Sequence, residues 1–176
     1  MSIRFDDRVA IVTGAGGGIG KQHALELAKR GAKVVVNDLG GSVDGSGASD
    51  AAEEVVDRIK SNGGEAISNG ASVTDLEAVK AMVNQTMDKW GRIDILINNA
   101  GILRDKSFHK VTIDDFNLVM DVHFQGTLNC THTVFPIMRE QEYGRIVFTS
   151  SSSGVFGNFG QTNYGSAKMA MVGLMK

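Results

Sequence analysis

The sequence contains one cysteine, one proline and 6% aromatic residues, and what it lacks excludes several classes of protein. A lone Cys130 cannot form an intrachain disulfide, which fits a reducing compartment, by default the cytoplasm. The net charge of -2 lacks the basic excess typical of nucleic-acid or membrane-surface binding. No apolar run approaches the ~20 residues of a membrane helix, and acidic residues occupy the N-terminus where a signal peptide would be apolar. We therefore expect a small-molecule partner, with neither nucleic acid nor membrane.

Strand-like and helix-like segments alternate along the chain. Apolar runs predict buried strands at Val9–Thr13 and at residues 33–38, 65–68, 93–98 and 145–149. Apolar residues at helical spacing predict helices over residues 19–30, 50–60 and 76–90, and a long helix opened by a capping box at Thr112, with Pro136 kinking or stopping it. The alternation predicts one α/β domain, a doubly wound Rossmann-type parallel sheet with strand order 3-2-1-4-5.

Glycine is the residue in excess, with 22 in the chain, and its positions indicate a use. Residues 13–20 read Thr-Gly-Ala-Gly-Gly-Gly-Ile-Gly and join the first strand to the first helix. Residues without a Cβ permit a tight turn and let the backbone approach a pyrophosphate, which a helix N-terminus attracts. A glycine-rich turn without a ligand is the alternative. The second glycine-rich stretch, residues 40–49, is interpreted as a flexible surface loop.

Asp38 ends the second predicted strand, about twenty residues after the glycine loop. A carboxylate there can accept hydrogen bonds from the adenosine ribose hydroxyls, while its charge repels a 2′-phosphate. No arginine or lysine stands beside it or within residues 14–20. The sequence therefore predicts NAD as the cofactor rather than NADP.

Tyr164 and Lys168 are four residues apart, so both lie on one face of a predicted helix. A phenol ordinarily has a pKa of about 10, and a neighbouring cation stabilises the phenolate. The Tyr-x-x-x-Lys pattern is common by chance, but Ser151 precedes it at the end of the fifth predicted strand. Ligands of open α/β sheets bind at the carboxyl ends of the strands, so these three side chains are candidates for catalysis.

Taken in order, these motifs resemble the classical short-chain dehydrogenase/reductase family. The matching residues are Gly14, Gly18, Ile19 and Gly20 of the loop, Asp38, Asn99-Ala100-Gly101, Ser151, Tyr164 and Lys168. The resemblance implies Tyr164 as general acid/base, Ser151 as hydrogen-bond partner of the reacting oxygen, and Lys168 as ligand of the nicotinamide ribose that favours the phenolate. It places Asn99, Ala100 and Gly101 along the cofactor cleft. It also places Ser72 and Val73 at the adenine, with Ser72 replacing the acid often found there.

One position departs from the family pattern. The family usually has an asparagine in the central helix, part of a proton relay through water, and His123 occupies that position here. Two interpretations stay open: a relay residue, or a histidine satisfied within the core. The other three histidines, His23, His109 and His132, have no spacing that suggests metal ligation.

Three short stretches, residues 37–41, 101–105 and 157–161, resemble the (3R)-hydroxyacyl-CoA dehydrogenase domain of peroxisomal multifunctional enzymes. This finer resemblance implies a 3-hydroxyacyl-CoA substrate whose C3 transfers hydride to NAD. The alternatives are a ketoreductase of acyl-carrier-protein substrates or steroids, and a nucleotide-binding module without catalysis. The family resemblance further implies a homodimer or homotetramer, and a peroxisomal location is the alternative to the cytoplasm in a eukaryote.

The chain ends at Lys176, eight residues after Lys168 and within the predicted catalytic helix. By the resemblance, the rest of that helix, a loop that closes on the nicotinamide, the substrate-binding helices and two further strands would follow. We therefore expect residues 1–176 to be an NAD-binding domain truncated within the catalytic helix, with its fifth strand left as a sheet edge.

Overall fold

Five parallel strands form one sheet in the order β3-β2-β1-β4-β5, which confirms the predicted strand order. The computed structural model describes residues 3–47 and 49–176. The strands are β1 (Val9–Thr13), β2 (Lys33–Asn37), β3 (Glu65–Asn69), β4 (Ile95–Asn98) and β5 (Arg145–Phe148). Each predicted strand is present, and the largest difference in its ends is the start of β4 at Ile95 rather than at residue 93.

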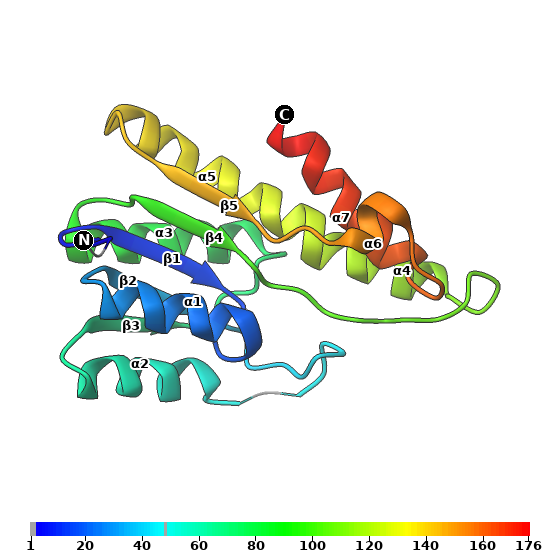
Figure 1. Cartoon of the computed structure of the whole chain (residues 1–176), viewed down its shortest axis with the longest axis horizontal. Helices are drawn as coiled ribbons and strands as arrows, with labels where there is room; N and C mark the ends of the chain where they lie inside the picture. The colour runs from blue at the N-terminus through cyan, green and yellow to red at the C-terminus, as the bar shows by residue number, and fades with distance from the viewer. Residues whose placement is uncertain (1–2, 48) are drawn as a thin grey trace.

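Helices cover both faces of the sheet (Figure 1). The two faces are covered by α1 (Gly18–Lys29) with α2 (Ala51–Ser61), and by α3 (Leu76–Trp90) with α5 (Gly126–Glu140). Every residue of β1 is buried, because successive side chains point to opposite covered faces. Val12 packs in the core cluster with Leu27 of α1, and Ile11 packs in the other cluster with Val134 of α5. The apolar runs are therefore the signature of a sheet buried on both sides.

The long helix predicted after Thr112 is divided into three segments. The first, α4 (Ile113–Met120), is capped by Thr112, whose Oγ1 accepts a hydrogen bond from the Asp115 amide at 3.0 Å, as predicted. A π-helical turn, η1 (Asp121–Gln125), follows and leads into α5. Of the two outcomes predicted for Pro136, a stop is wrong, because α5 continues to Glu140. Met138, beyond the proline, is buried in the core, and this packing offsets the lost backbone hydrogen bond.

The last helices lie together at the carboxyl ends of the strands (Figure 1). These are α6 (Ser152–Phe156), a short helix that the sequence did not predict, and α7 (Thr162–Met175). α7 packs against α4, α6 and η1, which positions Tyr164 and Lys168 at this end of the sheet. β5 is the last strand of the sheet, and its Val147 is 44% exposed. Within residues 3–47 and 49–176, no helix has both the length and the apolar character needed to cross a bilayer.

A buried carboxylate, Asp94, ties the start of β4 to β1. Its oxygens accept hydrogen bonds from the Val9 amide at 2.9 Å, from Arg8 at 2.8 Å and from Arg92 at 2.7 and 2.8 Å. Burial alone would raise the pKa of Asp94, but the hydrogen bonds from Arg92, Val9 and Arg8 prevail and lower it. This ion-pair cluster lies at the amino ends of the strands, away from Tyr164 and Lys168.

Replacing Asp94 by asparagine should lower the free energy of unfolding at pH 7 by about 2 kcal/mol, because charge-assisted hydrogen bonds are lost from a buried site. Urea denaturation measures the change. Asp6→Asn is the matched control, since it breaks an exposed pair with Arg4 at 2.7 Å and should hardly alter stability. Equal losses in the two variants would contradict the structural role of Asp94.

Candidate functional site

A cavity of about 680 Å³ lies at the carboxyl ends of the strands and contains most of the predicted site residues. Open α/β sheets bind ligands at this edge, where the strand order reverses between β1 and β4. The predicted residues in its lining are Gly14, Gly18, Ile19, Asp38, Ser72, Val73, Asn99, Ala100, Gly101, His123, Tyr164 and Lys168. Gly20 and Ser151, both in the described part of the chain, lie outside this lining.

The glycine loop combines open and crowded positions. A Cβ on Gly17 or Gly18 would meet no atom within 4 Å, so this part of the loop is free to approach a ligand. A Cβ on Gly20 would lie 2.1 Å from the Gly14 carbonyl oxygen, and Gly14 has a φ of +61°. Gly20 therefore lets α1 pack closely against the loop, which is a different use from the ligand contact predicted for it.

Asp38 is fixed beside the glycine loop by two backbone amides. Its Oδ2 accepts a hydrogen bond from the Gly16 amide at 2.8 Å, and its Oδ1 accepts one from the Gly40 amide, also at 2.8 Å. Each carboxylate oxygen retains a further lone pair, so the group can still accept bonds from two neighbouring hydroxyls. The residues present thus fit the ribose of a dinucleotide lying across the N-terminus of α1.

Thr13 and Asn99 clamp the ends of β1 and β4 together. The Thr13 Oγ1 accepts hydrogen bonds from the amides of Asn99 and Ala100, each at 3.0 Å. The Asn99 side chain donates to the carbonyls of Thr13 and Gly14 at 3.1 and 3.0 Å. Asn99 was predicted only to line the cleft, but its amide group also fixes the shape of the glycine loop. Sequence reasoning did not assign Thr13 a role, although it is the polar end of an apolar strand.

Lys168 is buried beneath Tyr164 on the same face of α7. Its side chain is only 3% exposed, its Nζ donates to the Thr149 carbonyl oxygen, and it lies 5.3 Å from the centroid of the Tyr164 ring. Burial lowers the pKa of Lys168 to about 8. The predicted pairing of the phenol with a cation is therefore present in the geometry.

His123 lies in the π-helical turn η1, and its ring meets Tyr164 edge-on with the centroids 5.2 Å apart. Its Nε2 is 2.8 Å from the Ile102 carbonyl oxygen and 3.1 Å from the Ile102 amide nitrogen. The shorter contact favours the proton on Nε2, which leaves the buried Nδ1 as a lone pair without a protein partner among the described residues. Burial, and then the charge of Lys168, lower the pKa of His123 to about 4, so the ring is neutral at pH 7. π-helical turns occur frequently at functional sites.

Ser151 is the N-cap of α6, and its Oγ accepts a hydrogen bond from the Ser153 amide at 3.2 Å. The Ser151 hydroxyl can still donate its own proton to a ligand. Its neighbour Ser150 donates to the Lys168 carbonyl oxygen at 2.9 Å and joins this loop to α7. The run of serines at 150–153 gave no indication of which hydroxyl would cap α6 and which would bind α7.

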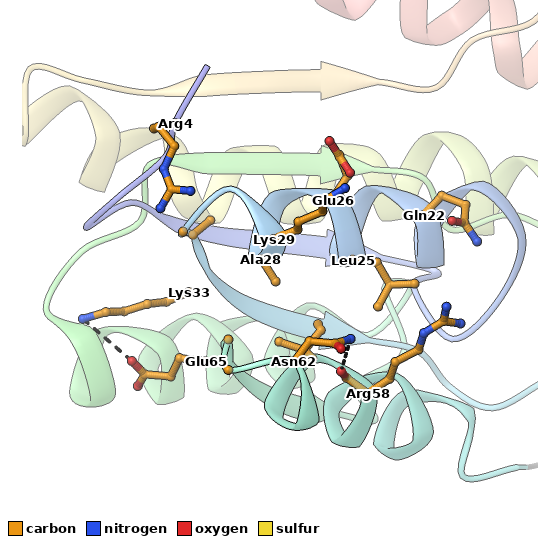
Figure 2. Close-up of a pocket in the computed structure, with 15 residues that line it drawn as sticks. Arg4, Gln22, Leu25, Glu26, Ala28, Lys29, Lys33, Arg58, Asn62 and Glu65 are labelled. Carbon is orange, nitrogen blue, oxygen red and sulfur yellow. Dashed lines mark hydrogen bonds and ion pairs between the residues drawn. The ribbon is translucent and has the colours of Figure 1, made fainter. Parts of the chain in front are cut away.

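A larger hollow, of about 890 Å³, lies at the opposite edge of the sheet and contains none of the predicted site residues. Figure 2 shows its mixed lining, in which Lys33 and Glu65 begin β2 and β3, Lys29 ends α1, and Asn62 caps the C-terminus of α2. The basic side chains there lie among acidic ones, and Lys33 is 4.0 Å from Glu65. The smaller cavity, where the glycine loop, Asp38, Tyr164 and Lys168 converge, is the candidate functional site.

Comparison with known proteins agrees with this geometry. The short chain dehydrogenase family matches residues 8–176, so the chain belongs to that family. It is 58% identical over 175 residues to peroxisomal multifunctional enzyme A of Dictyostelium discoideum, and 55% identical over 173 residues to peroxisomal multifunctional enzyme type 2 of Drosophila melanogaster. These alignments cover 99% and 98% of the chain but only 39% and 28% of the two relatives. The predicted resemblance to peroxisomal multifunctional enzymes is confirmed.

Among solved structures, the fold is similar to a 7α-hydroxysteroid dehydrogenase complexed with NADH and 7-oxo glycochenodeoxycholic acid. The TM-score is 0.88 at 34% identity, and the alignment covers 97% of this chain and 64% of that one. The fold class and the family predicted from the motifs are therefore confirmed together.

Replacing Gly20 by alanine should lower the free energy of unfolding by about 1–3 kcal/mol, because the new methyl group would overlap the Gly14 carbonyl. Thermal unfolding followed by circular dichroism measures this loss. Gly173→Ala is the control, since a Cβ there meets nothing within 4 Å and alanine favours a helix interior. If Gly20→Ala were as stable as Gly173→Ala, the close packing of α1 on the loop would be disproved.

His123 should make the protein sensitive to mild acid. The pKa of His123 is about 4 in the folded protein, below its ordinary value of 6.5. Between these two pH values the unfolded state therefore binds more protons than the folded state. The free energy of unfolding consequently falls as the pH falls from 6.5 to 4. The expected loss from His123 is roughly 3 kcal/mol between pH 6.5 and pH 4. Urea denaturation at several pH values should show a shallower dependence in His123→Gln, and an unchanged dependence in His109→Gln, which alters an exposed histidine. Identical slopes in all three proteins would refute the burial of a neutral His123.

Proposed function

We propose that this chain is the dinucleotide-binding and catalytic part of an NAD-dependent oxidoreductase acting on a secondary alcohol or ketone. One observation carries the proposal: a single cavity is lined by the glycine loop, by Asp38 and by the Tyr164–Lys168 pair. The first two suit a dinucleotide, and the third suits proton transfer to or from an alcohol. The NADH complex of a similar solved structure supports the cofactor class.

NAD, when bound, supplies the hydride acceptor for alcohol oxidation, and the residues of the chain supply position and proton transfer. In this proposal Asp38 accepts hydrogen bonds from the adenosine ribose, and its negative charge disfavours a 2′-phosphate. The N-terminus of α1, opened by Gly17 and Gly18, faces the pyrophosphate. Gly101 and Ile19 line the same cavity and complete its wall.

Tyr164 removes the proton from the substrate hydroxyl, or returns it in the reverse direction. The phenolate form of Tyr164 accepts this proton, and Lys168 stabilises that form because its charge lies 5.3 Å from the ring in a site where burial limits screening by water. Ser151 donates its hydroxyl proton to the reacting oxygen. His123 is proposed as the relay residue. Its Nδ1, which has no partner in residues 3–47 and 49–176, would accept a hydrogen bond while the ring stays neutral.

We infer a (3R)-3-hydroxyacyl-CoA as the alcohol and a 3-ketoacyl-CoA as the ketone. The support is the resemblance of residues 37–41, 101–105 and 157–161, together with identity above one half to two peroxisomal multifunctional enzymes. The names of those relatives also favour a peroxisomal location over the cytoplasm. A homodimer or homotetramer stays a prediction.

The deciding experiment follows NADH absorbance with (3R)-3-hydroxyacyl-CoA and NAD, for the chain and for Tyr164→Phe. The chain should form NADH, and the variant should lose at least 100-fold in kcat, because a general acid/base contributes about 10²–10⁴-fold. Tyr143→Phe is the control, since its ring contacts Arg8 and Arg145 outside the cavity. Turnover unaffected by Tyr164→Phe would overturn the mechanism. Binding of NAD without turnover would favour a nucleotide-binding module, and turnover only with a steroid or an acyl-carrier-protein substrate would replace the acyl-CoA.

A further inference from the structure

The segment 40–47, between β2 and α2, is folded on itself at the mouth of the cavity. The Ser42 amide donates to the Ser46 carbonyl at 2.6 Å, and the Gly45 amide donates to the Ser42 carbonyl at 2.8 Å. Asp44 accepts hydrogen bonds from the amide and the hydroxyl of Ser46 at 3.0 and 2.6 Å. The sequence predicted only a flexible surface loop here. Residues 41–47 are indeed exposed, but Gly41, Ser42, Val43 and Gly45 also line the cavity.

The segment is tethered to the opposite side of the cavity. The Leu103 amide donates to the Val43 carbonyl oxygen at 2.9 Å, and a Cβ built on Gly45 would lie 3.3 Å from the Ile102 side chain. Ile102 is buried, and its backbone amide and carbonyl lie within hydrogen-bond distance of the His123 Nε2. The chain therefore crosses the cavity from the end of β2 to the segment that follows β4.

Three exposed apolar residues lie in or next to this crossing and line the cavity. Leu39, Val43 and Leu103 are 60%, 70% and 38% exposed, and all three line the cavity. Val73, on the β3 side, lines it as well. Apolar surface concentrated at the mouth of a pocket, beside polar groups such as Asp38, is typical of a site that covers an apolar part of a ligand.

The order of the groups along a dinucleotide indicates which apolar part of the ligand these side chains would cover. Asp38 suits the adenosine ribose, the N-terminus of α1 suits the pyrophosphate, and Tyr164 and Lys168 suit the nicotinamide end. The apolar ring beyond the Asp38 ribose is then adenine. We propose that residues 40–47 form a strap over the adenosine half of NAD, with Val43 as its contact residue and the Val43–Leu103 hydrogen bond as its fastening. This inference rests on the proposed function, because it requires the dinucleotide site.

Calorimetric titration of the 176-residue chain with AMP, ADP-ribose, NADH and reduced nicotinamide mononucleotide tests the strap. Val43→Ser should weaken AMP, ADP-ribose and NADH binding about five- to tenfold, because a valine side chain loses its covered apolar surface. Binding of the nicotinamide mononucleotide should not change. Val43→Ile, which keeps an apolar side chain at this position, should bind all four ligands as the unchanged chain does. Val155→Ser alters an exposed valine of α6 outside the cavity and should have no effect on binding.

The results separate the strap from the function on which it rests. Equal AMP affinity in the chain and in Val43→Ser, with NADH still bound, would overturn the strap and leave the dinucleotide site intact. An equal loss for both half-molecules would also overturn it, since Val43 would then act on the whole pocket. Failure of the unchanged chain to bind NADH would overturn the proposed function, and the strap with it.

Discussion

The hydrogen bonds between Thr13 and Asn99 are the constraint on which the rest of the site depends. They join the last residue of β1 to the segment after β4, and these two strands are neighbours at the point where the strand order reverses. The two segments that follow β1 and β4 leave this point in different directions. The first enters the glycine loop and α1, and the second runs toward Ile102. The space between them is the cavity. The topology thus opens the cavity in which we propose that the dinucleotide binds, and the clamp joins its two sides.

Burial determines the electrostatics of the catalytic end. Lys168 and His123 are each 3% exposed, and burial lowers the pKa of both. The lysine, with a pKa of about 8, is still mostly charged at pH 7, whereas the histidine, with a pKa of about 4, is neutral. Tyr164 thus has one cationic neighbour and one neutral neighbour. That asymmetry leaves a single positive charge beside the Tyr164 ring in the buried site.

The fold could be predicted from the sequence because its signals are local and repeated. Runs such as residues 9–12 are apolar at every position, which is typical of a strand that is covered on both faces of the sheet. The glycines of residues 14–20 lie together at one turn between a strand and a helix. The π-helical turn around His123 was not predicted, because the sequence was interpreted as one continuous helix after Thr112. The continuation of α5 past Pro136 depends on burial of Met138, a tertiary contact.

The candidate site was predictable as a set of residues but less so as a set of roles. Gly14, Asp38, Tyr164 and Lys168 all line one cavity, since their spacing along alternating strands and helices determines where they meet. The sequence did not indicate that Gly20 serves packing, that Thr13 clamps two strands, or that residues 40–47 fold over the cavity. These roles depend on contacts between segments far apart in the chain.

The central claim is that a dinucleotide lies along the carboxyl edge of the sheet, and titration of the ¹⁵N-labelled chain with NAD, followed by NMR, tests it most directly. The amide signals of residues 16–20, Gly40, Val73 and residues 99–103 should shift together with a single dissociation constant. Signals of Lys29, Asn62 and Gly63, which line the larger hollow at the opposite edge, should stay in place. Shifts concentrated at that hollow, with the glycine loop unaffected, would contradict the account.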